Sequence, residues 1–231
     1  MGTAYYGYMM IGVITSLVGM FVSGRLKSKF RRYQQMPLQS GMTGREVAQQ
    51  MLDYYNIHDV RIVEGKGFLS DHYNPRSKVV SLSPDVYHGR NVSAAAVAAH
   101  ECGHAVQHAT AYSMLQMRSA LVPIVNMSAM AQQWLLLIAF MALNTMPQIM
   151  LITIVAFFVT TLFSFVTLPV EFDASNRALA WLENSGVARG AEQDGAKDAL
   201  WWAAMTYVAA ALSALVMLLY LIMRYRGATN R

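Results

Sequence analysis

The sequence predicts a mainly α-helical, polytopic membrane protein with about four transmembrane helices and a small α+β part outside the membrane. Of its 231 residues, 55% are hydrophobic and only 13% are charged, whereas soluble domains usually carry about 25% charged residues. The charged residues are also clustered, so that uncharged runs alternate with polar segments. Three such runs are long enough for the roughly 20 apolar residues that cross a bilayer, and one of them can cross it twice.

The first uncharged run covers residues 1–24, of which 4–22 is long enough to span a bilayer. Five basic residues follow at once, between positions 25 and 32. A secretory signal peptide is the alternative, but it would have basic residues before a shorter apolar run. We therefore predict a transmembrane anchor over residues 1–24, with interfacial tyrosines at one end: Tyr5, Tyr6 and Tyr8.

Residues 25–118 form the one sizeable polar segment, and it begins with a predicted helix. Thr43 and Glu46 have the spacing of a capping box, in which each side chain bonds the backbone of the other. The residues that follow form an apolar stripe of helical period: Val47, Met51 and Leu52.

Two short strands are predicted next, at 60–63 and 78–82, with a turn-rich stretch over 68–75 between them. The exposed edge of the second strand is suited to pair with an extended peptide. The alternative is that this strand only covers the helix that follows. That helix is predicted to start at an N-cap, either Asn91 or Ser93, and to continue through a stretch rich in alanine.

The predicted helix contains the pentapeptide His100-Glu101-Cys102-Gly103-His104. Residues four apart share one helix face, so His100 and His104 can occupy two corners of a tetrahedral zinc site. Glu101 then lies beside the open corner, where it can accept a proton from water. The alternative is a polar helix face with two ordinary histidines.

The second uncharged run, 119–170, is 52 residues long and accommodates two spans, near 120–142 and 148–168. The predicted turn between them lies at 144–147. The first span is the weaker one because it contains proline and amide side chains: Pro123, Asn126, Gln132 and Gln133. One interpretation lets this span begin as a continuation of the histidine helix.

Charged residues return directly after the second span, beginning with Glu171. A chain that crosses a membrane twice emerges on the side from which it entered, so Glu171 is on the same side as His100 and His104. A carboxylate from a separate helix completes one large class of such zinc sites. The alternative is an interfacial carboxylate that marks the end of the helix. Asp173 is the second choice as ligand, or else a partner that holds one histidine in its correct tautomer.

Residues 171–198 form a second polar segment, in which we predict a linker over 178–198 broken by glycines at 186, 190 and 195. Residues 199–231 contain the fourth predicted span and a short tail. Aromatic residues near both ends of this span suit the membrane interfaces: Trp201, Trp202, Tyr220 and Tyr225.

Basic residues predict the orientation of these spans. The segment 25–118 contains twelve of the 18 Lys and Arg residues, so the positive-inside rule places it in the cytoplasm. The segment 171–198 is then cytoplasmic too. The tail disagrees with this orientation because four spans place its basic residues outside, but charge next to the first anchor usually dominates. These residues are Arg224, Arg226 and Arg231.

Four blocks of the sequence resemble a known family: residues 71–83, 86–87, 98–109 and 168–175. They are similar to the neutral zinc metallopeptidases of bacterial membranes, of the YugP type, and more distantly to the HtpX-type membrane zinc proteases. The likeness extends from about residue 42 to residue 180. It implies a zincin-like cytoplasmic part within a polytopic protein of the bacterial plasma membrane.

The resemblance also implies an activity, namely zinc-dependent hydrolysis of peptide or membrane-protein substrates. By this likeness Zn²⁺ is held by His100, His104 and Glu171, with Glu101 as the general base. HtpX-type proteases tend to have an aspartate four residues after the glutamate ligand, where this chain has Ser175. Either Asp173 takes over the support of a histidine, or the surroundings of the metal differ.

An additional donor is expected to stabilise the oxyanion that forms during hydrolysis. The candidates, each with a structural role as its alternative, are His72, Tyr73 and His88.

Three classes of function compete. The first is an active zinc endopeptidase in the bilayer, and the second is a catalytically weak zinc-binding scaffold or quality-control adaptor. Glu101 argues against the scaffold because chemistry needs this residue and zinc binding does not. A channel or transporter would place ionisable residues inside its spans, and the four predicted spans contain no Asp, Glu, Lys, Arg or His. Nucleic-acid binding would need a basic face on a soluble domain.

Cys102 is the single cysteine, so an internal disulfide is excluded. We interpret it as a packed residue that faces away from the histidines.

Overall fold

The computed structural model of the chain describes residues 2–67, 69–143 and 145–229. Predictions for Phe68, Asn144 and Arg231, and for the side chain of Tyr5, lie outside the described residues. The chain divides into two compact units. Unit 1 comprises Met1–Val22, Met117–Leu168 and Thr206–Arg231, and unit 2 comprises Ser23–Gln116 and Pro169–Met205.

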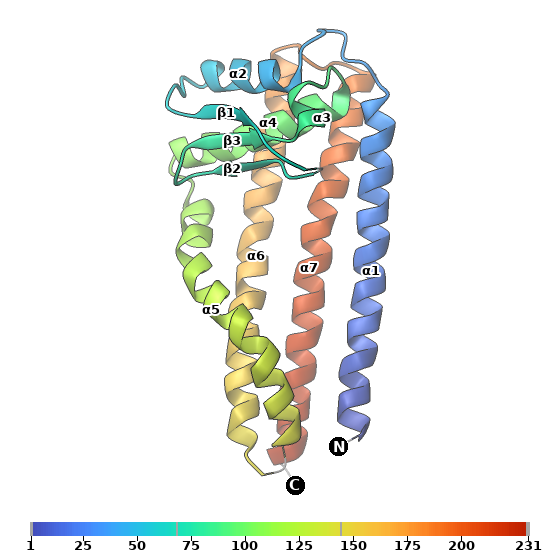
Figure 1. Cartoon of the computed structure of the whole chain (residues 1–231), viewed down its shortest axis with the longest axis vertical. Helices are drawn as coiled ribbons and strands as arrows, with labels where there is room; N and C mark the ends of the chain where they lie inside the picture. The colour runs from blue at the N-terminus through green and yellow to red at the C-terminus, as the bar shows by residue number, and fades with distance from the viewer. Residues whose placement is uncertain (1, 68, 144, 230–231) are drawn as a thin grey trace. The chain divides into compact units, whose positions relative to one another are not determined.

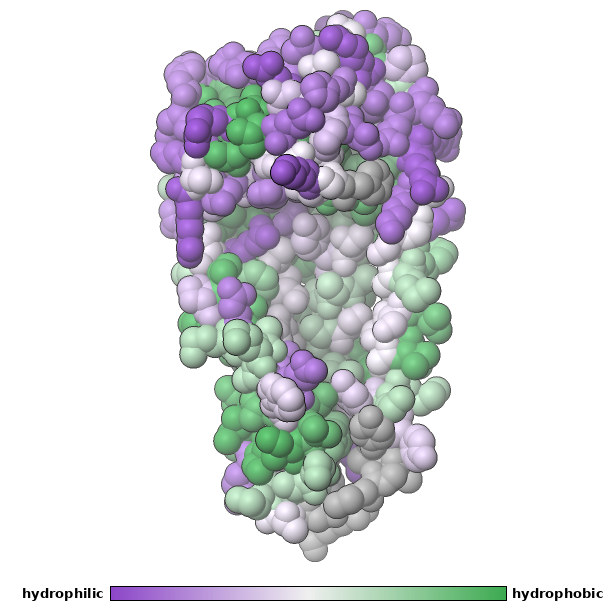
Figure 2. All heavy atoms as spheres, viewed as in Figure 1, coloured by the Kyte–Doolittle hydropathy of each residue, from purple (hydrophilic) through white to green (hydrophobic). Residues whose placement is uncertain are grey.

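The predicted fold class is confirmed: the protein is mainly α-helical and has a small sheet (Figure 1). The described residues contain four helices that are long and apolar enough to cross a membrane. They are α1 (Gly2–Gln34), α5 (Ser113–Met141), α6 (Pro147–Asn184) and α7 (Ala191–Thr229). Hydrophobic residues predominate on the visible surface of unit 1 and hydrophilic residues on that of unit 2 (Figure 2).

The linker predicted over 178–198 is wrong, because α6 continues to Asn184 and α7 begins at Ala191. The break covers only residues 185–190, where Gly186 and Gly190 have φ angles of 73° and 54°. Gly195 lies inside α7, and a Cβ added there would be 3.0 Å from the ring carbons of Tyr33. This glycine therefore serves close packing against α1 and does not break the chain.

The first span of the hairpin does not continue the histidine helix, so that interpretation is also wrong. The histidine helix, α4 (Val92–Ala109), ends before Thr110, and Ala111 has a positive φ of 52°. A left-handed residue cannot continue a right-handed helix, and α5 therefore starts anew at Ser113.

Hydrogen bonds between helices add to the apolar packing of unit 1. The Nε2 of Gln132 on α5 donates to the Ala156 carbonyl and the Thr160 hydroxyl on α6, at 2.8 Å each. Gln132, which weakens this span in a hydropathy profile, is thus paired within the helix bundle.

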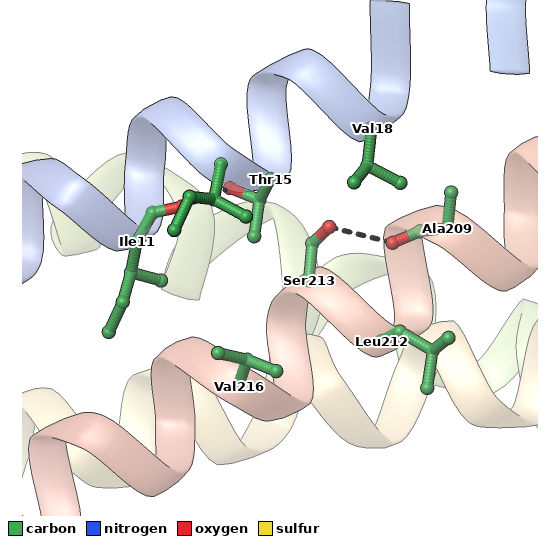
Figure 3. A pocket seen from close by; sticks show the side chains of 8 residues that line it. Ile11, Thr15, Val18, Ala209, Leu212, Ser213 and Val216 are labelled. Atoms are coloured by element: carbon green, nitrogen blue, oxygen red, sulfur yellow. Dashed lines mark hydrogen bonds between the residues drawn. The ribbon is translucent and has the colours of Figure 1, made fainter. Parts of the chain in front are cut away.

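An apolar pocket of about 270 Å³ lies between α1 and α7 in unit 1 (Figure 3). Its two hydroxyl groups are turned back to their own helices, with Thr15 donating to the Ile11 carbonyl and Ser213 to the Ala209 carbonyl. The lining otherwise consists of aliphatic side chains such as Val18. The pocket contains none of the residues predicted for the metal site.

The first helix that lies wholly within unit 2 is α2 (Gly44–Tyr54). The capping box predicted at its start is confirmed. The Thr43 hydroxyl accepts from the Glu46 backbone N–H at 3.2 Å, and the Glu46 carboxylate accepts from the Thr43 backbone N–H at 2.7 Å. The predicted apolar stripe is fully buried: Val47, Met51 and Leu52.

The sheet has three strands in the order β1-β3-β2. Strands β1 (Arg61–Glu64) and β3 (Val79–Leu82) match the predictions, whereas β2 (His72–Asn74) lies in the stretch predicted as turns. β3 pairs in parallel with β1 and antiparallel with β2. The predicted exposed edge of the 78–82 strand is therefore wrong, because both edges of β3 are paired, and among the described residues the open edges belong to β1 and β2.

The core of unit 2 is built around α4, which the short helix α3 (Pro84–Tyr87) precedes. Asn91 is the N-cap of α4, since its side chain accepts from the Ala94 N–H at 2.9 Å, whereas Ser93 is buried inside the helix. α4 contacts α2, α3, β2 and β3, and almost every residue from Val92 to Gln107 is buried. This packing gives the histidine helix a rigid setting.

Candidate metal centre

The candidate site lies where α4 packs closely against the C-terminal part of α6. A Cβ added to Gly103 would be only 2.5 Å from the Ala174 carbonyl oxygen and 3.1 Å from the Ala174 carbonyl carbon and Cα. Only glycine permits two helix backbones to approach this closely. Gly103 lies between the two histidines in sequence, and Ala174 lies three residues after Glu171.

The close approach brings His100, His104 and Glu171 together. The Oε2 of Glu171 is 3.4 Å from the Nε2 of His100 and 3.6 Å from the Nε2 of His104. The three potential ligand atoms lie within 4.8 Å of one another. Glu171 is only 2% exposed, and buried carboxylates are normally paired or bound to metal.

The donor set fits zinc. Both histidines use Nδ1 for a contact with a neighbouring side chain, so each can direct an Nε2 lone pair to the centre of the triad. Two imidazole nitrogens and one carboxylate oxygen are a known ligand set of catalytic zinc, which keeps its fourth position for water or substrate.

The electrostatics of the triad favour a cation. Burial by itself lowers the pKa of the His104 imidazole, but the carboxylates of Glu171 and Glu101 outweigh this effect, so the pKa is raised on balance. A site that stabilises an additional proton in this way also suits a divalent metal ion.

His104 is held by a chain of polar side chains that leads to α6. Its Nδ1 is 3.0 Å from the Oε1 of Gln107, and the Nε2 of Gln107 donates to Asp173 Oδ2 at 2.8 Å. The same carboxylate oxygen accepts from the Nε of Arg177 at 2.6 Å. Asp173, the alternative ligand in the sequence, thus reaches His104 only through Gln107.

His100 has a different partner, the hydroxyl of Ser175, whose Oγ is 3.1 Å from Nδ1. The sequence left open whether Asp173 takes over a supporting role or the surroundings differ at Ser175. In the structure Ser175 lies beside His100, whereas Asp173 contacts no histidine directly among the described residues and is connected to His104 through Gln107.

Glu101, the predicted base, is 8% exposed and follows His100 on α4. Among the described residues, no hydrogen bond or ion pair engages its carboxylate. The group is therefore available to a water molecule or a substrate.

The predicted oxyanion donors are not gathered at the triad. His72 and His88 are exposed, with contacts to the Ser70 carbonyl at 2.8 Å and to Glu64 at 3.2 Å, respectively. Tyr73 contacts α4. Its hydroxyl is 2.8 Å from the Nδ1 of His108, which lies one turn beyond His104. Burial raises the pKa of Tyr73 to about 12, so its hydroxyl stays protonated at neutral pH.

Cys102 is fully buried on α4, with its Sγ 3.5 Å from the Ala48 carbonyl oxygen on α2. Burial raises the pKa of the thiol far above its ordinary value, which disfavours the thiolate that a metal would need. The cysteine between the two histidines is thus a packing residue.

Gln107 is the residue that the sequence analysis missed. Its position three residues after His104 places both side chains on one helix face, so the spacing itself was a usable signal. The contacts to Val170 and Asp173 could not be inferred, because they depend on how α6 crosses α4.

Comparisons with known proteins indicate the family of this chain. A family model described as "Putative neutral zinc metallopeptidase" matches residues 8–226. The protein named "Putative membrane protease YugP", from Bacillus subtilis (strain 168), is 41% identical over 199 residues, which cover 86% of this chain and 88% of that protein. No solved structure matches the chain significantly. Since the family match includes both helices that carry His100, His104 and Glu171, the chain belongs to the neutral zinc metallopeptidase family.

Proposed function

We propose that this protein is a membrane-embedded, zinc-dependent endopeptidase. The observation that carries the proposal is the convergence of His100, His104 and Glu171, with the free carboxylate of Glu101 on the same helix as the two histidines. A scaffold that only binds zinc does not require a buried glutamate such as Glu101 beside the ligands, with its carboxylate free to accept a proton. The adaptor function is therefore the weaker candidate.

His100, His104 and Glu171 would hold Zn²⁺, and Glu101 would carry the proton transfers. When bound there, Zn²⁺ would supply Lewis-acid chemistry, which makes the attacking water more acidic and polarises the substrate carbonyl. Glu101 accepts the proton that the attacking water loses. It then returns the proton to the nitrogen of the leaving amine, which makes it both general base and general acid.

The open edge of β2 is the proposed binding surface for an extended substrate segment. Within the part of the chain that the structure describes, β2 pairs only with β3, and it contacts α4. A strand edge offers unpaired backbone N–H and C=O groups that bind a peptide by β-augmentation, largely independently of its sequence. This mode of binding suits unfolded polypeptides or loops of membrane proteins.

The proposed location is the bacterial plasma membrane, with the active site on the cytoplasmic side. Four candidate membrane helices support membrane insertion. The concentration of twelve Lys and Arg residues in 25–118, the segment that carries the two histidines, supports the cytoplasmic side. The partners are then the bilayer and peptide or membrane-protein substrates, and no nucleic acid.

A metal-depletion experiment tests the proposed function. The purified full chain in detergent is expected to cleave an unfolded protein such as casein, to lose this activity after dialysis against a chelator, and to regain it with about one equivalent of Zn²⁺ per chain. Product formation is measured by gel and by mass spectrometry of the peptides. Cleavage that persists unchanged in the metal-depleted protein would refute the proposal.

A further inference from the structure

We propose that Gln107 is a positioning residue that fixes the tautomer of His104 and aligns this imidazole with Glu171. The inference rests on the proposed function, since it assigns His104 and Glu171 to a zinc ion. It concerns a residue outside the His-Glu-x-x-His motif and outside the predicted ligand set.

The orientation of the Gln107 amide is determined by its neighbours. Its Nε2 has two acceptors, the Val170 carbonyl at 2.7 Å and Asp173 Oδ2 at 2.8 Å. A flipped amide would direct its oxygen at both of these oxygens, so the NH₂ group must face α6. The amide oxygen is thereby directed at His104 Nδ1, at 3.0 Å.

This orientation of the amide selects the tautomer of the His104 imidazole. An amide oxygen only accepts hydrogen bonds, so Nδ1 must carry the hydrogen that Gln107 accepts. In the neutral imidazole that a metal ligand must be, Nε2 is then the nitrogen without a hydrogen, and it is the nitrogen 3.6 Å from Glu171. The network therefore orients the imidazole so that Nε2, and not Nδ1, is the nitrogen offered to a metal.

The same side chain also fixes the spacing between the two helices that carry the ligands. Gln107 is fully buried on α4, and its contact at Val170 is the peptide carbonyl directly before Glu171. Its second contact, Asp173, is held in place by Arg177 at 2.6 Å. One amide thus contacts a histidine on α4 and the backbone that carries the carboxylate on α6.

His100 lacks a partner of this kind. The Ser175 hydroxyl beside its Nδ1 can donate or accept a hydrogen bond, so it does not impose a tautomer. The orientation of the ligand imidazoles therefore depends more on Gln107 than on Ser175. We expect the Ser175→Ala variant to lose less zinc affinity than a variant of Gln107.

The test compares two glutamines that both donate to a carbonyl of α6. Gln107→Met keeps the length of the side chain but removes all three hydrogen bonds, and it is expected to weaken zinc binding by about 10- to 100-fold. Gln193→Met is the matched control, because Gln193 donates to the Leu179 carbonyl at 2.9 Å, and no described hydrogen bond or ion pair joins it to His100, His104 or Glu171. Zinc affinity is measured on the full chain in detergent by competition with a chromophoric chelator.

A second readout separates positioning from general stability. The visible absorption of Co²⁺ bound in place of zinc reports ligand geometry, and we expect it to change in Gln107→Met and to stay unchanged in Gln193→Met. Thermal unfolding of the metal-free forms measures the purely structural cost of each substitution. If Gln107→Met does not fold, Gln107→Asn serves instead, since its amide is too short to reach His104, Val170 and Asp173 together.

The outcomes distinguish this inference from the proposed function. If the parent chain binds zinc and Glu171→Ala does not, while Gln107→Met binds zinc as tightly as the parent with the same Co²⁺ spectrum, the inference about Gln107 is overturned and the metal site stands. If the parent chain itself binds no zinc, the proposed function fails and the role of Gln107 fails with it.

Discussion

Replacing Glu101 by glutamine is expected to abolish peptide-bond cleavage while zinc stays bound. The amide has nearly the shape of the carboxylate, so packing around a residue that is 8% exposed should persist. It cannot accept a proton, however, and loss of a general base or acid typically costs about 10²- to 10⁴-fold in rate. Because Glu101 would act in both proton transfers, we expect the loss to lie at the upper end of this range.

The measurement combines the cleavage rate on an unfolded protein with the zinc content of the same preparation. Glu183→Gln is the matched control, because it makes the same chemical change at an exposed position of α6, and it should cleave like the parent. A Glu101→Gln protein that contains zinc and cleaves at the parental rate would show that another group is the base.

Replacing Gly103 by alanine is expected to remove zinc binding and cleavage together. The new Cβ would lie 2.5 Å from the Ala174 carbonyl oxygen, and a helix backbone cannot move aside as a flexible side chain can. α6 must therefore shift, and Glu171, less than one turn from Ala174, shifts with it. Overpacking of this kind costs about 1–3 kcal/mol, which exceeds the roughly 1 kcal/mol that alanine gains over glycine in a helix.

Zinc content and thermal unfolding, measured with and without added zinc, test this expectation. The stabilisation of the parent by zinc should be absent in Gly103→Ala. Gly24→Ala is the control, because Gly24 is also helical but a Cβ there meets no atom within 4 Å. Retention of full zinc stabilisation in Gly103→Ala would contradict the claim that the close approach of α4 and α6 forms the site.

Local signals in the sequence were sufficient for the elements whose interactions are local. The capping box of Thr43 and Glu46 and the N-cap at Asn91 depend on residues three positions apart, and their geometry follows from the helix itself. The four apolar helices follow from hydropathy, because each must be long enough to cross a bilayer.

The elements that were missed depend on contacts between distant segments. β2 has only three residues, and it is a strand because His72 and Asn74 pair with β3. The continuity of α6 through residues 178–184 was obscured by polar side chains, which lie on a helix whose other face, including Trp181, is buried in unit 2. Periodicity over so few residues does not distinguish such a helix end from a linker.

The candidate site shows the same division. The spacing of His100 and His104 indicated a shared helix face, and the predicted membrane hairpin together with the resemblance pointed to Glu171. The contact of Ser175 with His100 and those of Gln107 with Val170 and Asp173 were not assigned in advance, because each joins residues 63 to 75 positions apart in the sequence. Those contacts depend on the close approach of α4 and α6 at Gly103, which no local pattern encodes.

The most direct test of the central claim is the zinc content of the purified parent chain compared with that of Glu171→Ala, determined by elemental analysis after removal of loosely bound metal. The carboxylate contributes the third ligand that completes the site of His100 and His104, so we expect about one zinc per chain in the parent and a marked loss in the variant. Equal zinc content in the two proteins, or none in the parent, would contradict the assignment of this triad as the metal centre of a hydrolase.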